Sequence, residues 1–187
     1  RFTYQENGVI MTRKANSTIA DTLLNIRDFN LILKNSGIDS LSRIPSITWI
    51  DESSFSFTVK NNVYDLNMGK GSVALVNTYP EEAENTDSGP EGKLIAYTLK
   101  NNLFIASSGK QIQITNDEDP GIVNGQTVHR NEFGIFKGTF WSPGGNYLAY
   151  YRKDETMVTD YPLVNIDSRV ATVESTKYPM AGMYSEH

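Results

Sequence analysis

The chain has 187 residues, with 39% hydrophobic and 21% charged residues and a net charge of -5 at pH 7. This length and composition indicate a globular chain with a hydrophobic core and exclude a disordered one. The acidic balance and the scattered basic residues argue against a nucleic-acid partner, because phosphate binding needs clustered Lys and Arg. No apolar run approaches the roughly 20 residues that span a bilayer. The absence of cysteine excludes disulfides, thiolate metal sites and cysteine nucleophiles.

Residues 1–39 are expected to form short strands and one helix. Apolar residues alternate with polar ones up to residue 15 and are interrupted by Asn7-Gly8, which predicts one or two strands and a turn. Residues 22–34 carry apolar side chains at helical spacing, and the stop signal Asn-Ser-Gly follows them, so they predict the one helix. We expect this helix to cover an open edge of a sheet, although its apolar face would also suit a protein partner.

From residue 43 onward the pattern changes to short strands and turns, and a repeat appears. Residues 58–64 read TVKNNVY and residues 98–104 read TLKNNLF, an offset of 40 residues. Four positions are identical, and the other three exchange one strand-forming apolar residue for another. In each copy a strand runs into Lys-Asn-Asn and out into a second strand, as in a tight hairpin.

A period near 40 residues with short antiparallel strands is typical of β-propeller blades. The aromatic strands that flank the turn-rich sequence SPGGN, residues 142–146, indicate a further unit. We therefore predict an all-β fold, an incomplete propeller with four-stranded, blade-like units at residues 40–77, 92–125 and 138–187. Three blades do not close a ring, which needs about four to eight, so we expect a part of a longer protein whose uncovered blade faces favour self-association. An isolated duplicated hairpin is the alternative interpretation.

Three polar or glycine-rich segments lie between the strands. Residues 79–91 are acidic and contain Pro and Gly, so we expect a solvated loop. Residues 116–121 offer oxygen ligands without the spacing of a calcium loop, which favours a polar turn. Residues 69–74 fit a loose dinucleotide fingerprint, but no helix is predicted after them, so they also indicate a turn. We expect neither a metal ion nor a cofactor.

Sequence motifs for catalysis are absent. No Gly-x-Ser-x-Gly nucleophile elbow occurs, and the two histidines, His129 and His187, do not suit a zinc site built on paired His. We therefore expect no catalytic residue within the chain. One acid, Glu132, lies between Asn131 and Phe133 just before the aromatic strands. Judged by its sequence neighbours alone, it is an ordinary surface acid at a strand end.

Residues 129–134 (HRNEFG) and 140–150 (FWSPGGNYLAY) resemble the dipeptidyl peptidase IV family of serine exopeptidases, most closely the bacterial prolyl tripeptidyl aminopeptidases and their relatives. The match extends to further short segments, at residues 93–97, 101–104, 154–158, 161–164 and 178–182. It is specific from residue 93 to residue 187. The resemblance implies an eight-bladed N-terminal propeller, followed by a C-terminal α/β-hydrolase domain that carries the Ser-Asp-His triad outside this chain.

The resemblance also implies a site for the free N-terminus of a peptide. Family members insert a short propeller segment whose acids bind the substrate's α-amino group, through two adjacent glutamates in the dipeptidyl members. Here Glu132 matches the second glutamate, Asn131 stands at the first, and Arg130 is adjacent to the motif without aligning with the family's propeller arginine. A single glutamate is more similar to the tripeptidyl type. Glu132, with Asn131 and Arg130 beside it, is the substrate-binding candidate.

We expect the chain to be the propeller portion of a secreted or periplasmic, prolyl-specific di- or tripeptidyl peptidase, inactive alone, with its leader outside this sequence. Its expected partners are a peptide N-terminus, the hydrolase domain of the same protein and a second copy of itself. A carboxylate would bind the substrate ammonium through a charge-assisted hydrogen bond, and an N-blocked peptide would leave that carboxylate unpaired. The alternative is a non-catalytic propeller that only binds a protein partner.

Overall fold

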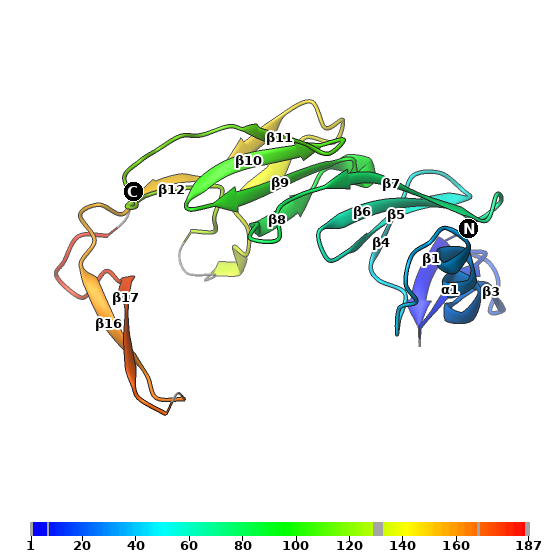
Figure 1. Ribbon diagram of the computed structural model, residues 1–187, viewed down its shortest axis with the longest axis horizontal. Coiled ribbons are helices and arrows are strands. Elements are labelled where there is room, and N and C mark those ends of the chain that lie inside the picture. Colours follow the sequence, from blue (N-terminus) through cyan, green and yellow to red (C-terminus); the bar gives the residue numbers. More distant parts are fainter. Residues whose placement is uncertain (1, 7, 129–132, 168, 186–187) are drawn as a thin grey trace. The chain divides into compact units, whose positions relative to one another are not determined.

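The computed structural model describes residues 2–6, 8–128, 133–167 and 169–185 (Figure 1). The chain divides into two compact units, unit 1 with Arg1–Glu81 and Glu91–Lys93, and unit 2 with Glu82–Pro90 and Leu94–His187. Apart from one α-helix and short 3-10 turns, the regular structure of the described residues is antiparallel β-strand. The predicted all-β class is therefore confirmed.

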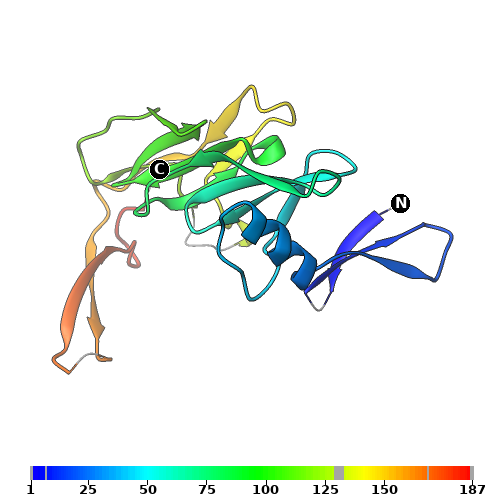
Figure 2. The same cartoon turned by 45° about the vertical axis from the view of Figure 1, so that its right-hand side comes forward.

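Unit 1 begins with a three-stranded antiparallel sheet that leads into helix α1 (Figure 2). The strands lie in chain order: β1 (Phe2–Glu6), β2 (Val9–Arg13) and β3 (Ala20–Asn25). Glu6 pairs with Val9, so the predicted hairpin at the N-terminus is confirmed, while Asn7 of its turn lies outside the described residues.

Helix α1 (Ile26–Asn35) begins later than its apolar spacing predicts. Residues 22–25 belong to β3 instead, because Thr22 and Leu24 pair with strand β2. The Asn25 side chain then caps the helix: its oxygen accepts a hydrogen bond from the Asp28 backbone N–H at 2.9 Å, and its amide donates to the Asp28 carboxylate at 2.7 Å. The helix prediction is thus confirmed for residues 26–34 and wrong for residues 22–25.

The rest of unit 1 is a four-stranded antiparallel sheet. Its strands lie in chain order: β4 (Ile47–Trp49), β5 (Ser54–Val59), β6 (Asn62–Asn67) and β7 (Ser72–Thr78). Residues 68–71 form the turn between β6 and β7, so the predicted turn is confirmed there, and residues 72–74 already belong to β7.

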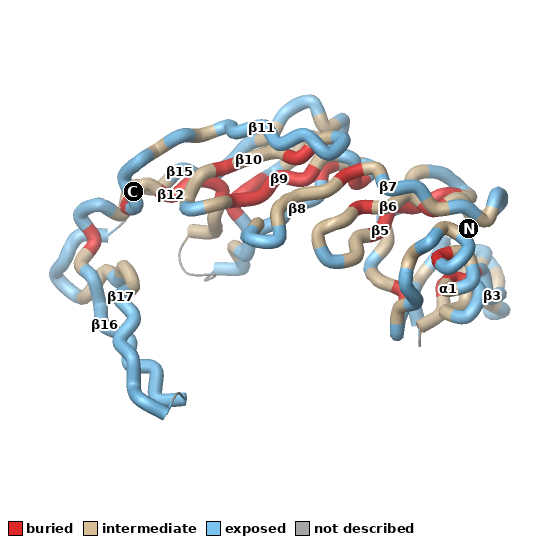
Figure 3. Tube along the Cα trace, viewed as in Figure 1, coloured by how far each residue is buried: buried red, intermediate tan, exposed pale blue. Residues whose placement is uncertain are grey.

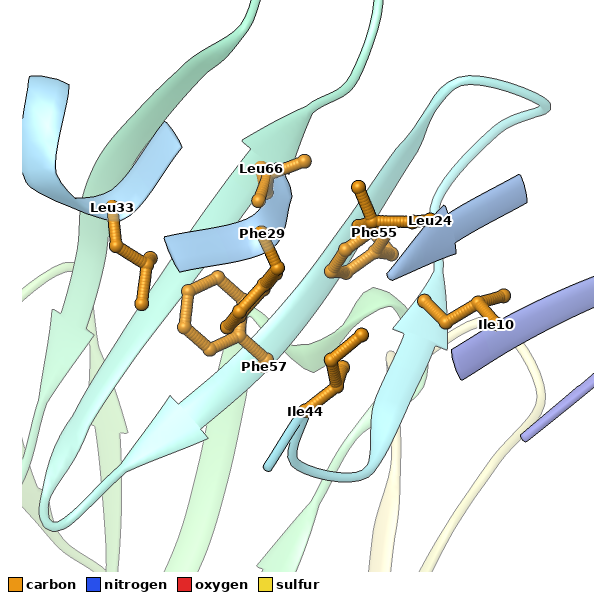
Figure 4. Close-up of a cluster of buried hydrophobic side chains, with 8 residues drawn as sticks. All are labelled: Ile10, Leu24, Phe29, Leu33, Ile44, Phe55, Phe57 and Leu66. Carbon is orange, nitrogen blue, oxygen red and sulfur yellow. The ribbon is translucent and has the colours of Figure 1, made fainter. Parts of the chain in front are cut away.

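Helix α1 packs on a face of this sheet, not on an open edge as the sequence suggested. Phe29 and Leu33, one helical turn apart, are fully buried, and the Phe29 ring meets the Phe57 ring edge-on at 5.3 Å between centroids. Each such side chain stabilises the fold by about 1.5–3 kcal/mol. Figure 4 shows the buried cluster that joins helix and sheets, formed by Ile10, Leu24, Phe29, Leu33, Ile44, Phe55, Phe57 and Leu66.

Unit 2 contains a second four-stranded antiparallel sheet. Its strands are, in chain order, β8 (Glu84–Ser88), β9 (Leu94–Leu99), β10 (Asn102–Ser107) and β11 (Lys110–Gln113). The buried residues of unit 2 concentrate in the middle of β9 and in β10, as the red segments of Figure 3 show. The two hairpins predicted from the repeat are confirmed as β5–β6 and β9–β10.

Strand β8 corrects the expectation that residues 79–91 form a solvated loop. Asp87 pairs with Ala96 of β9, and the Asn85 side chain donates a hydrogen bond to the Thr98 hydroxyl at 2.8 Å. These tertiary partners give an acidic segment a place in the sheet that its composition does not predict. At residues 116–121 the predicted polar turn is confirmed, since the Asp119 carboxylate accepts a hydrogen bond from the Gly121 N–H at 2.8 Å.

The C-terminal part of unit 2 forms three two-stranded pairs among the described residues. They are β12 (Ile122–Asn124) with β15 (Arg152–Asp154), β13 (Thr139–Trp141) with β14 (Leu148–Tyr150), and β16 (Asp160–Asn165) with β17 (Thr172–Lys177). The strand–turn–strand predicted around SPGGN is confirmed as β13–β14. The described strands of residues 138–187 do not form one four-stranded sheet, because they lie in these separate pairs, and β16 is exposed throughout (Figure 3).

Candidate functional site

The described residues on either side of the candidate acid form the ends of an insertion in a strand. β12 and β13 both pair antiparallel with residues 148–154, Asn124 opposite Arg152 and Thr139 opposite Tyr150. Between these pairs, Tyr151 stands opposite both Gly125 and Gly138. The Tyr151 carbonyl accepts a hydrogen bond from the Gly125 N–H at 2.8 Å, and its N–H donates to the Gly138 carbonyl at 2.9 Å. The strand leaves at Gly125 and returns at Gly138, which defines an insertion of residues 126–137.

Two glycines allow the base of the insertion to close. Gly125 has φ +69°, and a Cβ there would lie 2.9 Å from Cδ1 of Leu103 in β10. A Cβ at Gly138 would lie 2.1 Å from the Gln126 carbonyl oxygen. The two ends of the insertion are thus in direct backbone contact, and a side chain at either glycine would push the base apart.

The N-terminal end of the insertion is held by side-chain hydrogen bonds. The Gln126 amide donates to the Asn101 side-chain oxygen at 2.9 Å, which ties the insertion to the turn of the β9–β10 hairpin. The Thr127 hydroxyl donates to the Ile135 carbonyl at 2.7 Å and so joins the two limbs just above the base. Both contacts hold described residues at the ends of the insertion in place.

The C-terminal end is held by an acid in β8. The Lys137 ammonium lies 3.1 Å from each carboxylate oxygen of Asp87, and the Thr139 hydroxyl donates to the same carboxylate at 2.9 Å. The Trp141 indole N–H donates to the Asp87 backbone carbonyl at 3.2 Å. Only 16% of the Asp87 side chain is exposed, against 52% for Lys137. We call Asp87, Lys137, Thr139 and Trp141 the β8 anchor.

A second acid braces the strand on the other side of the base. The Asp117 carboxylate accepts hydrogen bonds from the Asn124 amide and from the Arg152 guanidinium, both at 2.9 Å. These two donors, Asn124 first, lower the pKa of Asp117 below its usual range. Because Asn124 and Arg152 are partners across β12 and β15, Asp117 bridges the two strands that carry the insertion.

The residues proposed to bind substrate, Glu132, Asn131 and Arg130, lie outside the described residues, as does His129. By their sequence numbers they occur within the insertion, whose two limbs end in described residues at Val128 and Phe133. Large apolar side chains on the C-terminal limb are exposed, Phe133 by 85% and Phe136 by 75%. The described ends of the insertion are thus braced by hydrogen bonds, and its C-terminal limb exposes aromatic surface.

The contacts of the β8 anchor were not predicted from the sequence. Asp87 lies in a stretch that its composition assigns to a loop, and Lys137 is separated from it by 50 positions. The one usable signal is the alternation of Lys137, Thr139 and Trp141, which places the three side chains on one face of an extended strand.

The described residues hold no cluster that would suit a metal ion: no three His, Cys, Asp or Glu side chains come together in them. Nor does the described part of the chain contain a helix with the length and apolarity that crossing a bilayer requires.

Comparison with known proteins shows where the chain belongs. The family model described as "Dipeptidyl peptidase IV (DPP IV) N-terminal region" matches residues 48–187. The chain belongs to the dipeptidyl peptidase IV family. The family resemblance noted from short segments between residues 93 and 187 is thereby confirmed, and the match also takes in the first hairpin repeat.

Individual relatives of this dipeptidyl peptidase IV family chain come from fungi, a mammal and bacteria. A "Probable dipeptidyl-aminopeptidase B" from Podospora anserina is 36% identical over 113 residues, which are 51% of this chain and 12% of that protein. "Dipeptidyl peptidase 4" from Felis catus is 33% identical over 132 residues, 67% of this chain and 16% of that protein. These relatives are named for dipeptidyl release, so the similarity is not confined to the bacterial tripeptidyl type.

Solved structures of the family share the fold. A crystal structure from Bacteroides ovatus, assigned as a dipeptidyl aminopeptidase IV, matches with a TM-score of 0.80 and 38% identity over 96% of this chain and 25% of that chain. Porphyromonas gingivalis dipeptidyl peptidase 4 matches with a TM-score of 0.65 and 22% identity over 98% of this chain and 28% of that one, which supports the fold alone. The present chain thus spans a small part of its relatives.

Proposed function

We propose that this dipeptidyl peptidase IV family chain is the propeller part of a serine exopeptidase, and that it recognises the free N-terminus of a peptide substrate. The observation that carries the proposal is the insertion of residues 126–137, which is fixed at both ends and includes Glu132. The catalytic triad would lie in a hydrolase domain elsewhere in the full-length protein, so this chain alone would be inactive. Access to that domain would be gated by the closed, eight-bladed ring that we propose for the whole propeller.

The chemistry of the proposed site follows from charge and distance. An exopeptidase must measure a fixed length from the substrate's ammonium group, and a carboxylate is the natural partner of that group. The hydrogen bonds at the base of the insertion would reduce the ordering cost of recognition. Asn131 and Arg130 would supply the polar contacts next to Glu132.

A peptide whose N-terminus is acetylated would be rejected at such a site. It brings no positive charge to Glu132 and leaves the carboxylate without its partner, at a cost of about 1–3 kcal/mol or more. Selection for a free amine would therefore come from the penalty on blocked peptides as well as from attraction of the correct ones.

We also propose that the full-length protein self-associates and acts in a secreted or periplasmic location. The ribbon β16–β17 and the residues around it support self-association, because they expose many apolar side chains that a second copy could cover. Those side chains include Leu163, Val164, Ile166, Val170 and Val173, each more than half exposed.

The experiment is kinetic and uses the full-length protein that contains this chain. Glu132→Gln should reduce kcat/KM for free-amino proline peptides by about tenfold or more, because only the charged interaction is removed. Glu91→Gln, which removes an exposed ion pair with Lys93 in unit 1, is the control and should leave kcat/KM unchanged. An unchanged rate in Glu132→Gln would remove this residue from the site.

The same assay separates the remaining alternatives. Comparing Xaa-Pro with Xaa-Xaa-Pro substrates distinguishes dipeptidyl from tripeptidyl release. A full-length protein that hydrolyses neither, and whose remaining sequence has no Gly-x-Ser-x-Gly, would instead support a non-catalytic propeller that binds a protein partner.

A further inference from the structure

The β8 anchor joins two segments that are far apart in the sequence through one acid. Lys137 and Thr139 lie on the same side of an extended segment, and both reach the Asp87 carboxylate. Trp141, two residues further on the same side, reaches the Asp87 main chain. The side chains of Lys137, Thr139 and Trp141 are therefore all bound to one residue of β8. These contacts fix the position and orientation of the strand that leaves the insertion.

Burial makes this contact specific. Thr139 is 1% exposed, so its hydroxyl has no access to bulk water and needs the Asp87 carboxylate as acceptor. The carboxylate in turn is mostly covered and is matched by a charged donor, Lys137. A neutral or shorter residue at position 87 could not satisfy both donors with the same geometry.

The β8 anchor also determines where the Lys137 ammonium lies. Lys137 follows Glu132 by five positions in the insertion, and its ammonium is chemically similar to the ammonium of a peptide N-terminus. While it is paired with Asp87, it is directed to the base of the insertion. Without Asp87 the same cation would be free to seek another carboxylate.

We propose that Asp87 is a positioning residue for recognition of the substrate's N-terminus. It holds the C-terminal limb of the insertion through Lys137 and Thr139, and it pairs with the Lys137 ammonium. This inference rests on the proposed role of Glu132. Asp87 does not touch substrate; it acts through the residues that carry the insertion.

The test compares Asp87→Asn with Glu132→Gln in the full-length protein. Asparagine keeps the size of the side chain and an acceptor for Thr139 but loses the charge that binds Lys137. We expect the KM for free-amino peptides to rise about three- to tenfold while kcat changes less than twofold, because the chemical step itself is untouched. The preference for free-amino over N-acetylated peptides should shrink by a similar factor.

A second readout distinguishes positioning from a general loss of stability. Amide hydrogen exchange should rise in residues 126–138 of Asp87→Asn and stay unchanged in β9 and β10. Lys137→Gln, which removes the same ion pair from the other side, should show the same local increase but a smaller rise in KM, because it leaves no free cation. Glu91→Gln again serves as the control for loss of an exposed ion pair.

The outcomes are separable. If Asp87→Asn leaves the free-amino preference and the local exchange unchanged while Glu132→Gln abolishes the preference, the positioning role is wrong and the proposed function stands. If Glu132→Gln also has no effect, the proposed function itself fails. If Asp87→Asn does not fold, Lys137→Gln carries the test, and normal exchange in residues 126–138 of that variant overturns the inference.

Discussion

The two repeated hairpins, β5–β6 in unit 1 and β9–β10 in unit 2, show how one structural motif is given two tasks. Their strand pairing is the same: Val59 pairs with Asn62 in the first and Leu99 with Asn102 in the second, so each turn has two residues. Lys60 has φ 54° and Lys100 has φ 47°, as tight hairpin turns require at their first position.

The cross-strand aromatic pair is also shared. Phe57 stacks on Tyr64 with a centroid distance of 5.5 Å, and Tyr97 stacks on Phe104 at 5.5 Å. Such pairs add about 0.5–1.5 kcal/mol beyond the burial of their area. The common sequence therefore encodes the same scaffold twice.

The difference lies in the second turn residue. The Asn61 amide donates to the carbonyl of Tyr79, the residue directly after β7 of the same sheet, at 2.6 Å. The Asn101 amide likewise donates to the Pro120 carbonyl at 2.9 Å, but its side-chain oxygen also accepts from Gln126 at 2.9 Å. The second hairpin thus braces the insertion that carries the predicted site. A motif that is repeated for stability acquires a functional role through one additional contact.

The largest expected effect comes from Gly125, which packs on the second hairpin. Gly125→Ala combines a positive φ with a collision against Leu103, so it should destabilise the protein by about 2–4 kcal/mol. Gly71→Ala in unit 1 is the matched control, because Gly71 has φ +59° and no atom within 4 Å of an added Cβ. Urea denaturation measures both, and equal losses would mean that the packing on the hairpin is unimportant.

The next effect compares the two turn asparagines. Asn101→Ala removes two side-chain hydrogen bonds and leaves Ala at φ 65°, so it should cost about 2 kcal/mol, while Asn61→Ala loses the hydrogen bond to the Tyr79 carbonyl and should cost about 1 kcal/mol. Only Asn101→Ala should raise hydrogen exchange in residues 126–138. An increase there in Asn61→Ala would break the distinction between the two turns.

The pH dependence of stability should reveal the brace around Asp117, which the second hairpin holds through Asn102. Since the pKa of Asp117 is lower in the folded state, the charged carboxylate stabilises the fold above its unfolded pKa, and this contribution is lost as the pH falls through the folded pKa. Asp117→Asn should therefore lose less stability between pH 7 and pH 3 than the unmodified chain. Thermal unfolding at the two pH values measures this. An equal loss of stability between pH 7 and pH 3 in Asp117→Asn and in the unmodified chain would contradict it.

The smallest effect should be the same in both hairpins. Lys60→Asn and Lys100→Asn place a residue that tolerates positive φ at each turn, and each should stabilise the protein by about 0.5 kcal/mol. Differential scanning calorimetry of the two variants measures the shift in Tm. A gain in Tm in one hairpin alone would show that the first turn positions of the two hairpins are not equivalent.

The elements that the sequence predicted correctly have local signals. The hairpins depend on alternation and on Lys-Asn-Asn turns, and both are contained in a few consecutive residues. Strand β8 and the start of α1 were missed because their partners are distant: Asn85 depends on Thr98, and Thr22 on strand β2. Propensity cannot report such contacts.

The candidate site was accessible to sequence reasoning only in part. The family resemblance led to Glu132, whose neighbours in sequence give no reason to select it. The pairing of both β12 and β13 with the segment 148–154 could not be foreseen. It depends on Tyr151 bonding to both Gly125 and Gly138, which are separated by the whole insertion. Likewise, Asp87 can be recognised as part of the anchor only from its contacts with Lys137 and Thr139.

The position of Tyr151 opposite both ends of the insertion has an evolutionary consequence. The pairing of β12 with β15 and of β13 with β14 does not depend on the number of residues between Gly125 and Gly138, since both glycines bond to Tyr151. The intervening segment can therefore change in length or sequence during evolution while the paired strands around it stay the same, provided that the contacts of its end residues Gln126 and Lys137 are kept.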